Sequence, residues 1–197
     1  MELMRRRGMM AAEQGTPIEW DYEWRYSDGL PENNGMTKTT SGSSTITMTS
    51  DGLKVSNAAN SWVRYTLPTA TMTTGIIECT FAGLFDNISN GVQNLRLCAS
   101  NGSNGGQTLV CQNKFRLFDT TLGPYRGTAI ADYENNTEYT VRIELNGSTF
   151  DVYINGQLVV SGIQCSSIYY ATANFMMVQN TGNSYYALIK SVRAKFS

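Results

Sequence analysis

Two Asn-Gly pairs constrain the fold of this chain more than any other feature. Asn146-Gly147 and Asn155-Gly156 lie in the segment EYTVRIELNGSTFDVYINGQLVVSG, which spans 138–162. Asn and Gly both tolerate the positive φ that a type I′ hairpin turn requires. Apolar and polar residues alternate on either side of each pair. The segment therefore predicts a three-stranded antiparallel meander with one buried and one solvated face.

The rest of the chain shows the same kind of pattern. From residue 18 onward, short alternating runs are separated by turns rich in Gly, Asn, Ser and Thr, and no helical periodicity of useful length appears. Because fourteen short strands exceed what one open sheet holds comfortably, we expect an all-β fold of two antiparallel sheets packed face to face, a jelly-roll β-sandwich. The expected strands are 18–27, 44–49, 52–57, 61–67, 75–86, 92–100, 107–112, 113–119, 127–132, 138–146, 149–155, 157–161, 173–179 and 184–196.

Alternation within these strands also predicts which side chains are buried. The expected core residues are Ile77, Cys79, Phe81, Leu95, Leu97, Phe115, Leu117, Val141, Ile143, Phe150, Val152, Leu188 and Val192.

Length and charge limit the organisation and the partners. The 197 residues suit one domain over 18–197, preceded by an N-terminal extension over 1–17. The extension is either a frayed leader or a short amphipathic helix, which Gly8 would weaken. The net charge of −1 gives no long-range field for nucleic acid, so we expect no nucleic-acid partner. No apolar run is long enough to insert into a membrane. The extension lacks the apolar stretch of a signal peptide, so we expect synthesis in the cytoplasm, with incorporation into a virion as an option.

Histidine and cysteine usage narrows the chemistry. The chain has no histidine, which removes the commonest metal ligand and the usual general base of nucleophilic catalysis. Cys79, Cys98, Cys111 and Cys165 show no CxxC spacing, so we expect no zinc site. We expect the four thiols to be reduced, with a Cys98–Cys111 bridge as the alternative.

The Asn-Gly hairpins, the segment YINGQLV and the closing run YYALIKSVRAKF together resemble the concanavalin A-like lectin/glucanase superfamily, in particular its laminin-G-like and carbohydrate-binding branches. The specific part of the resemblance covers 138–162 and 184–196. It implies a jelly-roll sandwich over 18–197, but members range from enzymes to receptors to capsid ornaments, so it implies no single function. The run LMRRRGMMAAEQ before a β-rich domain also resembles small structural or adhesion proteins encoded in prophages of gut bacteria.

Three carboxylates at alternate positions form a candidate catalytic group. Glu19, Asp21 and Glu23 would share one face of the first strand, opposite the aromatic residues that we expect to face the core, Trp20, Tyr22, Trp24 and Tyr26. Retaining glycoside hydrolysis uses two carboxyl groups about 5–5.5 Å apart, close to this spacing. Resemblance to glucanases with a Glu-x-Asp-x-Glu strand implies Glu19 as nucleophile, Asp21 as helper and Glu23 as acid/base. The alternative is a solvated face on an edge strand.

Aromatic and arginine side chains form a candidate ligand-binding group. Trp62 and Arg64 share one face of the strand SWVRYTL, and Tyr125 and Arg126 follow Gly123-Pro124 in a predicted loop. Aromatic rings pack on the apolar face of a pyranose, and polar neighbours orient its hydroxyls. These four residues are the predicted saccharide contacts.

The sequence favours non-catalytic recognition of a glycan or cell-surface polysaccharide by a module of a phage particle or bacterial surface. A glycoside hydrolase is one alternative. A structural protein that forms homo-oligomers or contacts other particle proteins through 1–17 is the other. We expect no cofactor; a structural calcium ion is left open, because four aspartates lie in or beside predicted turns, Asp28, Asp51, Asp86 and Asp119.

Overall fold

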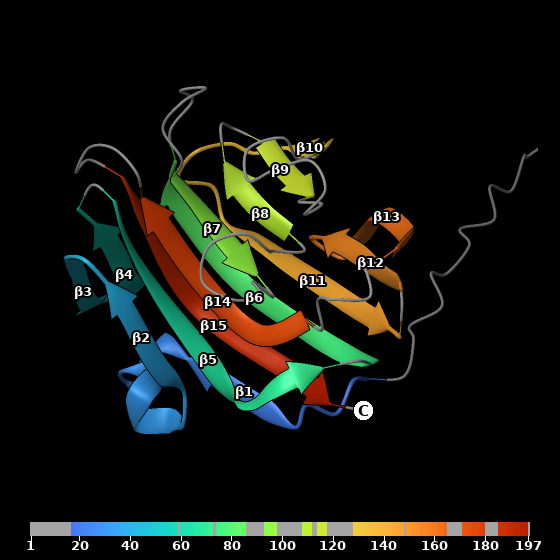
Figure 1. Cartoon of the computed structure of the whole chain (residues 1–197), viewed down its shortest axis with the longest axis horizontal. Helices are drawn as coiled ribbons and strands as arrows, with labels where there is room; N and C mark the ends of the chain where they lie inside the picture. The colour runs from blue at the N-terminus through green and yellow to red at the C-terminus, as the bar shows by residue number, and fades with distance from the viewer. Residues whose placement is uncertain are drawn as a thin grey trace, which may run out of the picture.

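The structure is a computed structural model that describes residues 17–58, 60–72, 74–85, 93–97, 108–111, 114–117, 128–147, 149–164, 171–179 and 185–196. These residues form fifteen strands in two antiparallel sheets, which confirms the predicted all-β sandwich (Figure 1). Within these ranges no helix is long and apolar enough to span a membrane. The predicted extension over 1–17 lies almost wholly outside the described residues, and its helix and its boundary stay predictions.

One sheet has eight strands. Seven of them follow the order β13-β12-β11-β6-β15-β4-β3, and β1 also pairs with β15. The strands are β1 (Tyr22–Arg25), β3 (Ser44–Thr49), β4 (Gly52–Asn57), β6 (Thr74–Leu84), β11 (Tyr139–Asn146), β12 (Thr149–Ile154), β13 (Gln157–Gln164) and β15 (Tyr186–Phe196).

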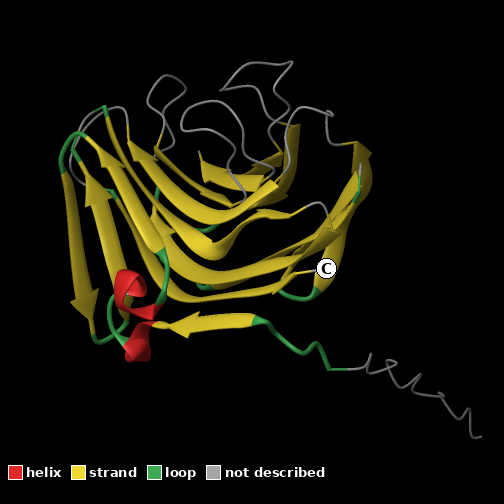
Figure 2. Ribbon diagram, turned by 60° about the horizontal axis from the view of Figure 1, so that its bottom comes forward, coloured by secondary structure: helices red, strands yellow, loops and turns green. Residues whose placement is uncertain are grey.

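The other sheet has seven strands in the order β10-β9-β8-β7-β14-β5-β2, and its central strands lie in front of β15 and β6 in Figure 1. They are β2 (Thr37–Ser41), β5 (Ser61–Met72), β7 (Gln93–Leu97), β8 (Thr108–Cys111), β9 (Lys114–Leu117), β10 (Thr128–Asp132) and β14 (Ala171–Gln179). Two short 3-10 turns, Tyr26–Asp28 and Pro31–Asn34, connect β1 to β2 and lie at one end of the sandwich (Figure 2).

The predicted meander is present as β11, β12 and β13. Asn155 and Gly156 have φ values of 50° and 78°, as a type I′ turn requires. The first turn is displaced by one residue from the prediction, because Asn146 still pairs with Thr149 and the connection begins at Gly147, whose φ is 61°. Glycine at that place supplies the positive φ without steric cost.

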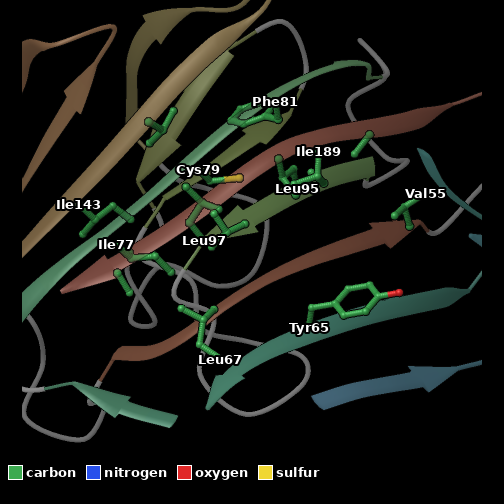
Figure 3. Packing of buried hydrophobic residues seen from close by; sticks show 14 of the residues in the cluster. Val55, Tyr65, Leu67, Ile77, Cys79, Phe81, Leu95, Leu97, Ile143 and Ile189 are labelled. Carbon is green, nitrogen blue, oxygen red and sulfur yellow. The ribbon is translucent and has the colours of Figure 1, made fainter. Parts of the chain in front are cut away.

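The core fills the space between the sheets (Figure 3). Ile77, Phe81 and Ile143 come from the eight-stranded sheet, and Leu95 and Leu97 from the seven-stranded one. Cys79 is fully buried among them with a reduced thiol, as expected. Cys98 and Cys165 lie outside the described residues, and the side chains of Cys111 and Leu117 are not described, so those predictions remain open.

Leu188 is a wrong core prediction. It is half-buried, whereas Ala187 and Ile189 are fully buried. The register of β15 against β6 shifts between Ile189 and Ser191, so Lys190 is the extra residue of a β-bulge. A bulge reverses the alternation, which is why the odd positions face the core before it and Val192 faces the core after it.

The start of the domain also differs from the prediction. Strand β1 begins only at Tyr22, so the alternation expected over 18–27 does not hold at Trp20. Trp24 is fully buried and Tyr22 is partly buried. Trp20 is half-buried and stacks on Arg193, whose Cζ atom lies 4.6 Å from the centroid of the Trp20 ring. Strand β2 was not predicted, because its sequence TKTTS has no apolar residue and every residue is exposed.

Candidate functional site

Strand β5 places Trp62 and Arg64 on the outer face of the seven-stranded sheet. Val63, Tyr65 and Leu67 alternate with them and are buried at 0–2% exposure, so the two predicted ligand contacts project away from the core. Both side chains are half-buried. The predicted sharing of one face by Trp62 and Arg64 is therefore present in the structure.

The strand beneath this pair is held firmly in place. The Tyr65 side chain on its inner face is fully buried, and burial together with the nearby charge of Glu32 holds the pKa of its phenol well above the ordinary value. At the beginning of β5, the Ser61 hydroxyl oxygen accepts a hydrogen bond from the Ser43 N–H at 2.9 Å. Gly42 lies so close to Ser61 that a Cβ would collide with its hydroxyl. These contacts dock β2 against β5 and fix the backbone that carries Trp62.

Arg64 and Trp62 form a loose cation–π pair. The Arg64 Cζ atom lies 5.9 Å from the Trp62 ring centroid, near the outer limit of that interaction. The Arg64 Nε atom is shielded from solvent and has no hydrogen-bond partner among the described residues. A buried donor without a partner costs free energy, so a water or ligand atom that reached this nitrogen would be stabilising.

Two other arginine–aromatic pairs, both on the outer face of the eight-stranded sheet, differ from this one. The Arg142 Cζ lies 4.2 Å from the Tyr153 ring centroid, and its Nε lies 3.1 Å from the Glu144 carboxylate. Arg193 stacks on Trp20 and donates from Nε to Glu78 at 3.1 Å. In both pairs a carboxylate neutralises the arginine. The structure records no such ion pair for Arg64 within the described part of the chain.

The strand register aligns two more arginines with Arg64, although the side chain of Arg96 lies outside what the structure describes. Arg64 is opposite Met176 on β14, which is opposite Arg96 on β7. Arg96 is opposite Leu109 on β8, and Leu109 is opposite Arg116 on β9. In the sequence, Arg96 and Arg116 each sit between two predicted core residues, and this alternation was the available signal.

The remaining predicted saccharide contacts are not tested. Tyr125 and Arg126 lie outside the described residues and stay predictions.

The three carboxylates of the hydrolase alternative lie at an edge of the eight-stranded sheet, and all three are exposed. Glu19 and Asp21 precede β1. Asp21 accepts a hydrogen bond from the Phe196 N–H at 2.7 Å, and Glu23 lies 2.8 Å from the guanidinium of Arg25. Asp21 thus bonds to the backbone of the neighbouring strand and Glu23 forms an exposed ion pair, as carboxylates on edge strands commonly do. This arrangement is the solvated edge that the sequence left as the alternative, and it gives the hydrolase no support.

The turn aspartates behave as turn residues where they are described. The carboxylate of Asp28 accepts the Arg25 N–H at 2.8 Å, and Asp51 lies in the turn between β3 and β4. Asp86 and Asp119 lie outside the described residues. Among the described residues, no group of three or more Cys, Asp or Glu side chains is placed to hold a metal ion.

No protein-family model matches the chain, and no curated protein does either. Solved structures match in fold. The carbohydrate-binding module CBM66 of Bacillus subtilis has a TM-score of 0.52 and 19% identity over 82% of this chain and 97% of its own. The potassium-bound carbohydrate recognition domain of Emp46p has a TM-score of 0.56 and 11% identity, and the match covers 80% of this chain and 87% of that domain. A Bacillus subtilis protein of unknown function with a galectin-like fold has a TM-score of 0.51 and 11% identity, and the match covers 80% of this chain and 88% of that protein. At these identities the likeness is one of fold alone, a two-sheet antiparallel β-sandwich.

Proposed function

We propose that this domain is a non-catalytic carbohydrate-binding module that takes a saccharide on the outer face of the seven-stranded sheet. Trp62 would supply an apolar ring face to a pyranose, and Arg64 would donate hydrogen bonds to its oxygens. The carbohydrate-binding module and the carbohydrate recognition domain among the similar folds support this class of function. Resemblance of the leader to prophage-encoded proteins supports a phage particle or a bacterial surface as its setting.

One observation carries the proposal. Trp62 is a half-buried ring on a regular, outward sheet face, next to a guanidinium whose shielded Nε has no hydrogen-bond partner in the described structure. An aromatic face beside an unsatisfied donor is the combination that a sugar needs, because a pyranose presents an apolar C–H face and a rim of hydroxyl acceptors. The arginines of the two pairs on the opposite sheet each have a carboxylate partner, Glu144 for Arg142 and Glu78 for Arg193, whereas Arg64 has none among the described residues.

Substitution of Trp62 by Ala tests the proposal. A pyranose that covers about half of the 150–250 Å² of an aromatic ring would contribute ~2 kcal/mol at ~25 cal/mol per Å². Isothermal titration calorimetry against the best ligand of a glycan array should therefore show roughly thirtyfold weaker binding for W62A.

Y153A is the matched control, because Tyr153 also lies beneath an arginine but on the opposite sheet. It should bind like the wild type. Thermal unfolding of both variants shows whether the sandwich is intact. Unchanged binding by W62A, or loss of binding only in Y153A, would place the ligand elsewhere and contradict the proposal.

A further inference from the structure

Strand β2 extends the proposed site to the edge of the seven-stranded sheet. Its sequence, TKTTS, contains no apolar residue, and all five residues are exposed. It pairs with β5 in a continuous antiparallel register, and among the described strands it is the last on this side of the sheet (Figure 1). Strand β2 therefore buries no apolar side chain, and what it adds to the surface is a set of hydroxyl groups.

The strand register decides which of these hydroxyl groups lie beside the proposed site. Lys38 and Thr40 are opposite Tyr65 and Val63, whose side chains are buried in the core. Residues directly opposite each other in an antiparallel pair have side chains on the same face of the sheet, and successive residues alternate between the two faces. The other three residues of β2 therefore lie on the outer face: Thr37, Thr39 and Ser41.

The outward residues of β2 and β5 form three successive cross-strand pairs. Residues two apart on a strand are separated by about 6.8 Å and neighbouring strands by about 4.8 Å, so the pairs form a patch about 13–14 Å long and two strands wide. The patch combines an indole ring, a guanidinium and four hydroxyl groups, with no carboxylate among its members. Its pairs are Ser41 with Trp62, Thr39 with Arg64 and Thr37 with Thr66, and we call it the β2–β5 patch.

The polar groups of the β2–β5 patch suit a sugar. Within the described part of the chain, the structure records no side-chain hydrogen bond for any of the four hydroxyl residues. The shielded Nε of Arg64 has no partner there either. Serine and threonine hydroxyls both donate and accept hydrogen bonds, whereas a guanidinium only donates, so together they match the hydroxyl groups of a saccharide.

We propose that the saccharide lies along β5 and β2, parallel to the strands, and that Thr39 and Ser41 are additional binding residues. One sugar ring stacks on Trp62 and bonds to Ser41, and the next ring bonds to Arg64 and Thr39. The inference rests on the proposed carbohydrate-binding function and specifies its ligand as an oligosaccharide. The patch is longer than a single pyranose ring, so a monosaccharide would occupy only the part at Trp62.

The test combines single-hydroxyl variants with ligands of increasing length. The probes are the mono-, di- and trisaccharides of cellulose, chitin, β-mannan and α-1,4-glucan, together with those of the best glycan-array ligand. Binding to the full chain is measured by isothermal titration calorimetry for the wild type, T39V and S41A. Valine keeps the branched shape of threonine and removes only its hydroxyl. T40V is the matched control, because Thr40 is an equally exposed threonine of β2 on the opposite face.

We expect the trisaccharide to bind more tightly than the monosaccharide. T39V and S41A should each weaken trisaccharide binding roughly two- to tenfold, since one neutral hydrogen bond disappears, and T40V should leave it unchanged. T39V should not affect the monosaccharide, which contacts only the Trp62 end of the patch. Melting temperatures of all three variants should stay near that of the wild type, because these hydroxyl groups make no recorded hydrogen bond within the described chain.

Three results would overturn this inference while leaving the proposed function standing, provided that W62A still weakens binding. In the first, T39V and S41A bind the trisaccharide as tightly as the wild type does. In the second, T40V loses as much affinity as T39V, which would show that β2 acts through its fold and not through contacts. In the third, the monosaccharide binds as tightly as the trisaccharide. Absence of binding to the whole glycan array would remove the proposed function and this inference together.

Discussion

Glu78 is the acidic residue whose removal should destabilise the sandwich most. Glu78 lies on the central strand β6 and is only 8% exposed. The strand register places Arg193 of β15 on one side of it and Arg142 of β11 on the other. Arg193 donates to the Glu78 carboxylate from both Nε and a terminal nitrogen. Replacement by Gln keeps the shape but removes the charge between two arginines.

The structure sets the size of the expected loss. Breaking a fully buried ion pair by removing one partner costs about 3–5 kcal/mol. The Arg193 side chain is 33% exposed and keeps its contact with Trp20, so water and the indole ring compensate part of its lost partner. We therefore expect E78Q to lower the free energy of unfolding by about 2–3 kcal/mol, between the buried and the exposed limits.

Urea denaturation followed by tryptophan fluorescence measures this loss. E23Q is the matched control, because Glu23 also pairs with an arginine but at an exposed site, where the cost should stay below about 1 kcal/mol. A double-mutant cycle with R193Q should give a coupling energy of about 1–3 kcal/mol between Glu78 and Arg193. If E78Q cost no more than E23Q, the pair would not act as a buried one and the reasoning would fail.

Of three further predictions, two concern the stability of the core and one concerns the titration of Tyr22. Y133F removes a buried hydrogen bond to the Gly83 carbonyl, 3.1 Å long, and should cost about 1–2 kcal/mol in urea denaturation. G52A places a Cβ 2.8 Å from the Ile189 carbonyl oxygen at a φ of 151°, and a loss of about 1–3 kcal/mol is expected in the same assay. Burial raises the pKa of Tyr22 from its ordinary 10.0 to about 12. The stability gained from the neutral phenol is therefore present below pH 10 and lost as the pH rises through 12. Absorbance titration of the wild type against Y22F measures this pKa.

Local signals predicted most of the fold. The Asn155-Gly156 turn and the alternation around it gave the meander with its buried face, because turn chemistry and a period of two are both properties of a few neighbouring residues. Strands β3 and β4 occur at the predicted bounds, 44–49 and 52–57. Each of these elements is bordered by residues that favour turns.

The misses share a different cause. Strand β2 forms because its backbone pairs with β5, and nothing in TKTTS marks that long-range contact. The bulge at Lys190 reverses the alternation within a run that reads as one uninterrupted strand, so Leu188 was assigned to the wrong face. Trp20 was expected to face the core, but strand β1 begins only at Tyr22, and Trp20 stacks on Arg193 instead. All three depend on partners far away in the sequence.

The candidate site follows the same division. Trp62 and Arg64 could be predicted as neighbours because they are two residues apart on one strand. Arg96 and Arg116 could not be joined to them, since their common level depends on four strand pairings between segments that the sequence does not connect. Cross-strand level is a tertiary property, and a single sequence carries almost no record of it.

The arginine–aromatic pairs on the two outer faces differ in their partners. On the eight-stranded sheet, Arg142 and Arg193 each combine an aromatic ring with a carboxylate, which neutralises the charge and ties adjacent strands together. On the seven-stranded sheet, Arg64 has the ring but no carboxylate within the described chain. A fold that needed this arginine only for stability would gain from an acidic neighbour on β2 or β14. Neither strand contains one, and this supports the proposed role of Arg64 as a ligand contact.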